Sequence, residues 1–575
     1  MTLITSLTLY SIILSITTFM RKHLTYKGLK VLLILNNFFF LGYCLISWNQ
    51  FVLNNVIEIF SLKLNPNTWT GVIYEIQFKI NFLSFLFILL VLIIGTATNI
   101  YILNYFKFEE RAEEFILLIN WFMLSMISLV CGNNFFTLIL GWELIGLTSF
   151  LLINFWKFKI TTLSCSFKAF TFNKISDLFL LLGFCILWEL YQVNNIDTLL
   201  TIINLNYNYK DNSLFYSAMC LILCSSIKSA QIFGHLWLPD SMEAPVPASS
   251  LIHSATLVSA GIFLILKFQT LFFLTNLLNT LFLLGGFTAC YGGIIAASQT
   301  DVKRLLAYST ISHCGFIISS IALNNIVVSI TYLYLHGLYK ALTFFCAGSL
   351  IKYNNTQDTR LMGSLKLQLV NSFTLLIASI NLGGLPFLLG YLYKQIFLIS
   401  LLNTNYNMIG FGFCLIGMLA SPIYVFKLNY YSCFDFRKGS LQTFFLNLQN
   451  TTQRTVYTYF TYTKVFAFFV IFLNSCLFFI ILKYYILKNY LNISVQPNTL
   501  INNISFLSLS LQIKMHLIKL YYSFFVLVCL ILILQKNRIN YFYLDYLSLF
   551  SNFISLACFI NIIFFITHSL LFNYV

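Results

Sequence analysis

The sequence contains few charged residues, and this scarcity decides its class. Asp, Glu, Lys and Arg make up 9% of its 575 residues, against roughly a quarter in an average soluble domain. Hydrophobic residues make up 59%, and apolar runs long enough to cross a bilayer as helices recur along the chain. The alternating short segments of a membrane β-barrel are not visible. We therefore expect an all-α polytopic membrane protein.

Motifs for metals and redox groups are also missing. The fourteen cysteines are scattered without a CxxC pair, and the chain lacks HExxH. Iron–sulfur, zinc and haem sites need such clusters, so we expect no metal and no cofactor on this chain. The net charge of +16 would suggest nucleic acid for a soluble protein. Here basic loops that set membrane orientation explain it, and no nucleic-acid partner is expected.

Sixteen membrane-spanning helices are predicted. They cover residues 4–20, 29–48, 80–105, 113–131, 134–155, 168–190, 214–236, 247–268, 274–297, 303–322, 326–350, 370–398, 407–427, 461–484, 516–535 and 553–573. Loops after odd-numbered helices carry twenty Lys and Arg residues, and loops after even-numbered helices carry six. Because basic loops stay on the inner side of a membrane, this asymmetry predicts one topology with both termini outside.

Eight ionisable residues lie well inside the predicted spans. They are Glu143, Lys174, Asp177, Lys228, His253, His336, Lys340 and Lys394. A charge at the bilayer centre costs about 2.5–3.5 kcal/mol on insertion scales, so these groups must pair, contact water or be neutral. Lys174 and Asp177 share one helix face, as do His336 and Lys340. Buried lysine and histidine can exchange protons near neutral pH, so the set predicts a proton pathway.

Four other basic residues allow a structural interpretation. Lys168 and Lys267 lie near helix ends, where a lysine commonly extends to the headgroups, and for these two the structural and functional interpretations stay equally open. His235 lies near the membrane edge, and His313 in "ISHCGF" is expected to be a packing residue.

Interruptions occur at corresponding places in two predicted helices. In the seventh helix, Gly234 and Pro239 follow Lys228, and in the twelfth, "NLGGLPFLLG" precedes Lys394. Such paired breaks at membrane depth are typical of repeated transporter units. We therefore predict two inverted five-helix repeats between an N-terminal region and a C-terminal extension. In chain order these regions are residues 1–112, 113–268, 269–428 and 429–575.

Six strings carry a family resemblance. They are "GWELIGLTSFLLINFW", "AFTFNKISDLFLLLG", "GHLWLPDSMEAPVPASSLIHSAT", "DVKRLLAYSTISHCG", "HGLYKALTFFCAGSLI" and "QDTRLMGSL". In this order they closely resemble the antiporter-like, proton-translocating subunits of respiratory complex I, NADH:ubiquinone oxidoreductase. The resemblance covers about residues 80 to 400, and sixteen helices suit the distal member of this family.

The resemblance implies roles for the first four buried residues. Glu143 and Lys228 are similar to the pair whose separation is thought to control proton release. Lys174 and Asp177 match the basic–acidic pair of the sixth helix, with Lys where Arg is common. We predict that Lys228 and Glu143 approach each other, because either charge alone is costly at that depth.

The other four residues match the second part of the family pathway. His253, His336 and Lys340 resemble its central hydrophilic axis, and Lys394 resembles the lysine of the exit half-channel. Gln395 stands where family members often have an acid, so the exit route is expected to use another acceptor or water.

The family also implies a setting. Flavin, iron–sulfur and quinone sites would lie on partner subunits of the membrane complex, among them a neighbouring antiporter-like subunit, with lipid around them. Abundant residues with A+T-rich codons favour a mitochondrial gene, and hence the inner membrane with both termini in the intermembrane space. The family's lateral helix has no clear counterpart, because residues 536–552 are too short and residues 486–515 are an alternative.

Two other functions stay open on the sequence alone. A cation/proton antiporter, stand-alone or multisubunit, shares this fold and most motifs, although the extension beyond residue 430 and the codon bias favour complex I. A structural subunit that does not pump is the third possibility, against which stands the cost of eight buried ionisable groups. Co-purification with NADH dehydrogenase activity would distinguish the first possibility from the second.

Overall fold

The computed structural model describes residues 2–434, apart from short gaps. The gaps are residues 24–25, 49, 52–55, 65–73, 107–108, 110, 206–211, 355, 364–368, 385–388 and 403–407. Three predicted spans, 461–484, 516–535 and 553–573, and both candidate lateral segments lie outside the described residues.

Helices dominate the described part of the chain. They are α1 (Leu3–Phe19), α2 (Tyr26–Ile46), α3 (Phe82–Tyr105), α4 (Ala112–Cys131), α5 (Phe135–Ile153), α6 (Ile160–Tyr191), α7 (Ile196–Leu205), α8 (Asn212–Lys228), α9 (Trp237–Asp240), α10 (Val246–Ser254), α11 (Leu257–Lys267), α12 (Gln269–Leu274), α13 (Leu278–Ser298), α14 (Val302–Ala322), α15 (Ile326–Asn354), α16 (Leu369–Gly383), α17 (Leu389–Leu402) and α18 (Met408–Asn429). The 3₁₀ turns are η1 (Met20–Lys22), η3 (Ser241–Glu243) and η4 (Thr359–Leu361), and η5 (Tyr430–Phe434) is a π-helical turn that follows α18.

Nine helical segments of the described residues are long and apolar enough to cross a membrane. Thirteen of the predicted spans fall in this part of the chain, and four of them are not among the nine. The segments concerned are α1, which is short, α15, which carries polar residues along its length, and the two interrupted helices, α8–α9 and α16–α17. The protein is therefore a multi-pass helical membrane protein, and the breaks that the sequence predicted are present.

One element departs from the all-α expectation. Strands β1 (Glu58–Leu64) and β2 (Tyr74–Ile80) form an antiparallel hairpin in which Glu58 pairs with Ile80. An ion pair joins the hairpin to a neighbouring helix: the Lys79 ammonium lies 2.7 Å from the Asp197 carboxylate of α7. The sequence analysis assigned no structure to this region, so the hairpin corrects the all-α prediction.

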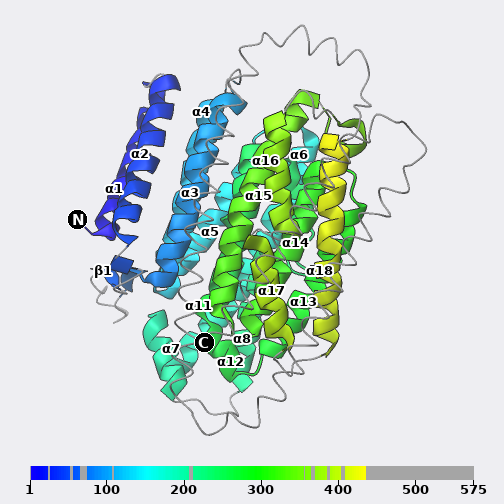
Figure 1. The fold of residues 1–575 in the computed structure, drawn as a ribbon. Helices are drawn as coiled ribbons and strands as arrows, with labels where there is room; N and C mark the ends of the chain where they lie inside the picture. The colour runs from blue at the N-terminus through cyan, green and yellow to red at the C-terminus, as the bar shows by residue number, and fades with distance from the viewer. Residues whose placement is uncertain are drawn as a thin grey trace, which may run out of the picture.

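The long helices lie side by side in one bundle (Figure 1), with α1 and α2 at one flank and α18 at the other. Helix α13 packs against both α14 and α18, and α3 packs against α10 and α15. Close approach between α13 and α14 depends on small residues, because a Cβ on Gly315 would lie 2.6 Å from the backbone nitrogen of Ala289. Small residues commonly allow such contacts between membrane helices.

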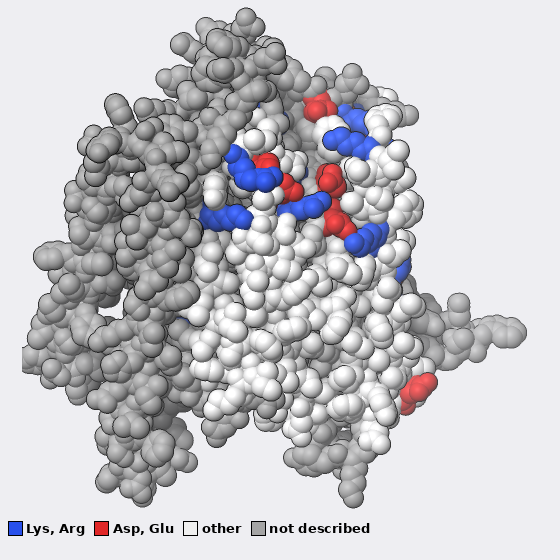
Figure 2. Space-filling model, turned by 90° about the vertical axis from the view of Figure 1, so that its right-hand side faces the viewer, with Lys and Arg blue, Asp and Glu red and all other residues white. Residues whose placement is uncertain are grey.

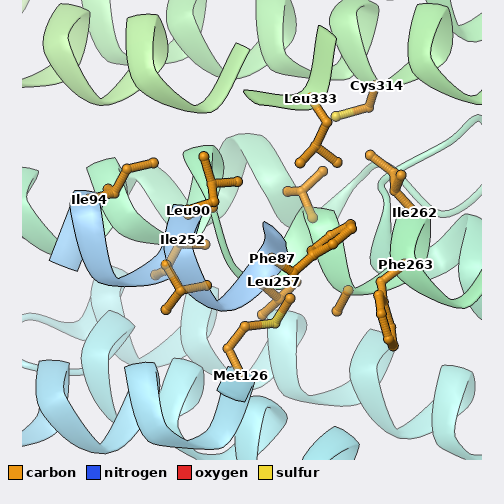
Figure 3. Packing of buried hydrophobic residues seen from close by; sticks show 14 of the residues in the cluster. Phe87, Leu90, Ile94, Met126, Ile252, Leu257, Ile262, Phe263, Cys314 and Leu333 are labelled. Atoms are coloured by element: carbon orange, nitrogen blue, oxygen red, sulfur yellow. The ribbon is translucent and has the colours of Figure 1, made fainter. Parts of the chain in front are cut away.

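Buried apolar side chains fill the centre of the bundle. Phe87 of α3 and Phe263 of α11 meet edge to face with ring centroids 5.1 Å apart. Met126, Ile252 and Leu333 bring α4, α10 and α15 into the same cluster (Figure 3), and each is at most 1% exposed. This packing holds together the helices that carry the candidate residues.

The outer surface separates charged from apolar side chains. On the face in Figure 2, nearly all visible lysines, arginines, aspartates and glutamates gather toward one end, and most of the rest lacks them. On α6, Leu178 and Leu182 are 61% and 54% exposed. Large exposed apolar surfaces of this kind mark contact with membrane or partner.

Candidate functional site

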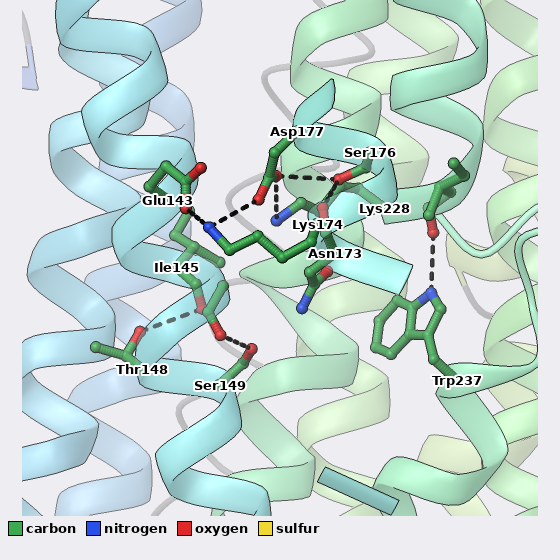
Figure 4. A network of polar contacts seen from close by, with 12 residues as sticks. Glu143, Ile145, Thr148, Ser149, Asn173, Lys174, Ser176, Asp177, Lys228 and Trp237 are labelled. Carbon is green, nitrogen blue, oxygen red and sulfur yellow. Dashed lines mark hydrogen bonds and ion pairs between the residues drawn. The ribbon is translucent and has the colours of Figure 1, made fainter. Parts of the chain in front are cut away.

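Four charged side chains from α5, α6 and α8 form a row of alternating sign (Figure 4). Glu143 of α5 forms an ion pair with Lys174 of α6. The ammonium of Lys174 lies 3.5 Å from Asp177, one turn along the same helix, and Asp177 lies 3.8 Å from the Lys228 ammonium. The sequence prediction that Lys174 and Asp177 share a helix face is confirmed.

The row runs from the surface of the chain into its interior. The side chains of Glu143 and Lys174 are 37% and 44% exposed, whereas those of Asp177 and Lys228 are 7% and 1% exposed. Glu143 and Lys228 form no direct ion pair, because Lys174 and Asp177 lie between them. Glu143 and Lys228, which the sequence predicted to approach each other, are therefore connected through Lys174 and Asp177 and not by direct contact.

Lys228 is the last residue of α8, directly before the helix break. Its ammonium has no hydrogen-bond partner among the described residues and lies 5.1 Å from the centre of the Trp142 ring. Beyond it, Ala230 (φ 53°) and Phe233 (φ 73°) adopt the left-handed conformation that non-glycine residues rarely take. The indole of Trp237 donates to the carbonyl of Ile227 at 2.9 Å and closes the break back onto α8.

His253 lies just before a second discontinuity. It is fully buried in α10, its Nε2 lies 3.2 Å from the Ser241 hydroxyl, and its ring stacks on Phe344 of α15. Helix α10 ends at Ser254 and α11 begins at Leu257. The predicted span over 247–268 is present as the segment Val246–Lys267, but it is interrupted between α10 and α11, which the sequence analysis did not predict.

His336 and Lys340 follow one face of α15, as predicted. The Lys340 ammonium is fully buried and donates to the hydroxyl of Ser309 and, at 3.1 Å, to the carbonyl of Leu306 on α14. His336 lies one turn away, with its Nε2 unpaired among the described residues. Its ring centroid is 5.4 Å from that of His313.

Lys394 occupies the second predicted break. It projects from α17, donates to the Gly383 carbonyl at the end of α16 at 2.7 Å, and donates also to the Ser421 hydroxyl of α18. Gly384 takes a left-handed φ of +73°, and a Cβ there would lie 3.0 Å from Cε of Lys394. Glycine is therefore required where the buried ammonium reaches the helix end. Gln395 donates to the Tyr391 hydroxyl on its own helix.

The residues that were assigned structural roles have specific partners. Lys168 forms a 2.5 Å ion pair with Asp240, and Lys267 donates to the carbonyl of Gly132. Neither contact needs the headgroups that the sequence analysis invoked. His235 lies 3.1 Å from the Tyr291 hydroxyl.

His313 was expected to be a packing residue, yet it lies among the candidate residues with both ring nitrogens in contact with tyrosine hydroxyls. Nothing in its local sequence indicated this position. Within the described ranges, no group of three His, Cys, Asp or Glu side chains is arranged to hold a metal ion.

Two of the quoted motifs contact each other at the start of α14. The backbone amide of Val302, in "DVKRLLAYSTISHCG", donates to the Gln357 carbonyl, in "QDTRLMGSL", at 3.1 Å. The hydroxyl and backbone amide of Thr359 donate to the carbonyl of Thr300, just before the first motif, at 2.7 and 2.9 Å. Asp358 accepts hydrogen bonds from the Arg360 guanidinium, which lowers the pKa of this partly exposed carboxyl. These contacts therefore position the loop before α14.

The comparison with known proteins decides the family. The model of the family described as "NADH:quinone oxidoreductase/Mrp antiporter, TM" matches residues 132–420, which include all eight candidate residues. A protein of Paramecium tetraurelia named NADH-ubiquinone oxidoreductase chain 5 is 39% identical over 468 residues, 79% of this chain and 82% of the relative. This chain belongs to the NADH:quinone oxidoreductase/Mrp antiporter family. The resemblance seen in the sequence motifs is confirmed.

Other members of the family match over less of their own length. Proteins of the same name from Wickerhamomyces canadensis and Cryphonectria parasitica are 34% and 33% identical over 72% and 69% of this chain. The matches span 63% and 61% of these two proteins, which is less than two thirds of their length.

Two solved structures share the fold of this chain. A chain of the archaeal membrane-bound sulfane sulfur reductase superposes with a TM-score of 0.66 at 15% identity, over 81% of this chain and 99% of that chain. A chain of the Mrp complex from Dietzia sp. DQ12-45-1b gives 0.67 at 19% identity, over 98% of this chain and 63% of the other. At these identities the similarity concerns the fold alone.

Proposed function

We propose that this chain is a proton-translocating membrane subunit of an NADH:ubiquinone oxidoreductase complex, respiratory complex I, in the mitochondrial inner membrane. The redox groups belong to partner subunits, and this chain moves protons through its buried lysines and histidines. The observation that carries the proposal is the row Glu143–Lys174–Asp177–Lys228, which leads from a half-exposed pair to a fully buried ammonium at a helix break. Named relatives of the family support this assignment.

Competition for Asp177 gives the row a means of control. Two ammonium groups, Lys174 and Lys228, lie within 3.8 Å of this carboxylate. A charge pair about 4 Å apart interacts by about 4 kcal/mol at an effective dielectric constant of 20. When the Lys174 ammonium moves toward Glu143, the Asp177 carboxylate interacts mainly with Lys228 and stabilises the protonated form of Lys228. When Lys174 moves toward Asp177, it competes for this carboxylate, and that stabilisation weakens. Movement of Lys174 thus changes the proton affinity of a residue deeper in the membrane.

The half-exposed end of the row faces a partner. Glu143 and Lys174 would be costly against lipid, so we place the neighbouring antiporter-like subunit on this side of α5 and α6. A charge shift in that neighbour would act first on Glu143.

Beyond Lys228, the proton continues through His253, Lys340 and His336 to Lys394. We assign Lys228 and Lys394, each next to a helix break, to two separate inverted five-helix repeats, residues 113–268 and 269–428. In this topology both chain termini lie in the intermembrane space. Residues 1–112 and 429–575 flank the repeats.

A cation/proton antiporter is the second candidate function. The description of the matching family, which names the Mrp antiporter beside NADH:quinone oxidoreductase, favours it. The two functions differ in what drives transport, since an antiporter exchanges cations for protons without NADH oxidation.

The decisive experiment measures proton uptake per NADH oxidised by the purified complex in sealed vesicles, with and without Lys228→Met. We expect the ratio to fall, because methionine keeps the volume and removes the titrating group. The control is Lys427→Met, which removes a lysine that donates to the Ala297 carbonyl away from the row and should leave the ratio unchanged. A normal ratio in Lys228→Met, or sodium-driven proton exchange without NADH, would overturn the proposal.

A further inference from the structure

His313 lies where three helices meet between His336 and Lys394. It is fully buried in α14. Its Nδ1 contacts the hydroxyl of Tyr332 on α15, and its Nε2 lies 2.9 Å from the hydroxyl of Tyr424 on α18. Both ring nitrogens are thus engaged by groups that can donate and accept protons.

Each of the two tyrosines lies about one helical turn from a residue of the proposed pathway or from its hydrogen-bond partner. On α15, Tyr332 is followed four residues later by His336, and their side chains share one face; the His336 ring centroid is 5.4 Å from that of His313. On α18, Tyr424 lies one turn after Ser421, whose hydroxyl accepts a hydrogen bond from Lys394. Polar groups therefore lead from His336 to Lys394 across three helices.

We infer that His313 is a proton-transfer residue that, together with Tyr424, connects His336 to Lys394. This inference rests on the proposed function. A proton leaves His336 and passes through the Tyr332 hydroxyl to one ring nitrogen of His313, while the proton on the other nitrogen leaves for the Tyr424 hydroxyl. Tyr424 gives up its own proton through Ser421 to the neutral amine of Lys394. Each N–H or O–H bond that breaks is matched by one that forms.

The alternative is that His313 only joins α15 and α18 by hydrogen bonds. His313→Gln separates the two roles, because a glutamine amide can accept from one tyrosine and donate to the other but cannot carry a proton at neutral pH. The chain offers a matched control, since His235 also contacts a tyrosine hydroxyl, that of Tyr291 at 3.1 Å, and lies outside the pathway.

The test compares His313→Gln, His235→Gln and Lys228→Met in the assembled complex in sealed vesicles, as proton uptake per NADH oxidised. We expect His313→Gln to lower the ratio to the level of Lys228→Met, and His235→Gln to keep the parental ratio. If His313→Gln does not assemble, Tyr424→Phe, which removes one hydroxyl and keeps the ring, decides in the same assay.

The outcomes separate this inference from the function on which it rests. A parental ratio in His313→Gln, or in Tyr424→Phe where that variant decides, together with a lowered ratio in Lys228→Met, overturns the role of His313 alone. A parental ratio in Lys228→Met overturns the proposed function itself.

Discussion

Replacement of Gly384 by alanine tests whether the break between α16 and α17 exists to hold the Lys394 ammonium. Gly384 has a φ of +73°, and a Cβ on it would collide with Cδ of Lys394 and lie 3.0 Å from Cε and 3.2 Å from Nζ. Alanine therefore strains the backbone and displaces the lysine side chain at the same time.

The two effects can be sized separately. A non-glycine residue in the left-handed conformation costs roughly 1–2 kcal/mol. The displaced ammonium loses its hydrogen bond to the Gly383 carbonyl, to the Ser421 hydroxyl or to both, and a hydrogen bond to a charged group contributes about 1.5–3 kcal/mol. With one bond lost, we expect Gly384→Ala to destabilise this region by about 2.5–5 kcal/mol.

The neighbouring glycine supplies the control. A Cβ on Gly383 would lie 3.5 Å from Val425, an ordinary van der Waals contact, and the Gly383 carbonyl would stay in place. The assay is the midpoint temperature for inactivation of NADH-driven proton uptake, together with the ratio of protons to NADH at 25 °C. Both should fall in Gly384→Ala and stay near parental values in Gly383→Ala. Equal behaviour of the two variants would refute the reasoning.

Two further substitutions test the first break and the row. Asp177→Asn leaves Lys228 without its carboxylate, and because an uncompensated buried charge costs about 3–5 kcal/mol, the ammonium should lose its proton and the ratio of protons to NADH should drop. Asp197→Asn, which removes the exposed partner of Lys79, should not change that ratio; equal ratios in the two variants would contradict the role of Asp177. Trp237→Phe removes the indole donor from the Ile227 carbonyl, which keeps the Ala230 backbone amide at 3.2 Å; the loss of one hydrogen bond costs about 0.5–1.5 kcal/mol and should lower the inactivation midpoint slightly. Trp188→Phe, at a residue 40% exposed, is its control, and equal midpoints would count against the expected effect.

Local sequence rules predicted the parts of the site that lie on one helix. The three-residue spacing of Lys174 and Asp177 places both on one face of α6, and their ammonium and carboxylate lie 3.5 Å apart. Glycine and proline beside Lys228 and before Lys394 predicted the interruptions, since these residues weaken helices directly.

Relations between helices were harder to predict. Helical spacing does not say which neighbouring side chain fills the space between Glu143 and Lys228, so the intermediates Lys174 and Asp177 were missed. The break after His253 falls at Ala255 and Thr256 and contains neither glycine nor proline. There the Thr256 hydroxyl donates to the Leu251 carbonyl at 3.0 Å, beside the Ala255 backbone amide at 3.3 Å, so a side chain competes with the backbone for a helix carbonyl.

His313 was missed for a similar reason. Its partners lie 19 and 111 residues away along the chain, and a single histidine in an apolar helix carries no spacing signal of its own. The β-hairpin fell between the predicted spans 29–48 and 80–105, where apolar and polar residues alternate, as in "YEIQFKI", a pattern that the search for apolar helices did not address.

The interactions of its ammonium group distinguish Lys228 from the lysines that donate to backbone carbonyls at helix ends. Several lysines donate to a carbonyl at the C-terminal end of a helix, where backbone oxygens lack partners and the helix dipole is negative. The pairs are Lys267 with Gly132, Lys352 with Tyr105, Lys394 with Gly383 and Lys427 with Ala297. A backbone carbonyl cannot change its charge, so the environment of these ammonium groups changes only if the helices move. Lys228 instead terminates its own helix, donates no hydrogen bond within the described structure, and has as its ion-pair partner the Asp177 carboxylate at 3.8 Å. Because Lys174 competes for that carboxylate, the proton on Lys228 can respond to a side-chain movement alone, which is the property that a controlled step of proton transfer requires.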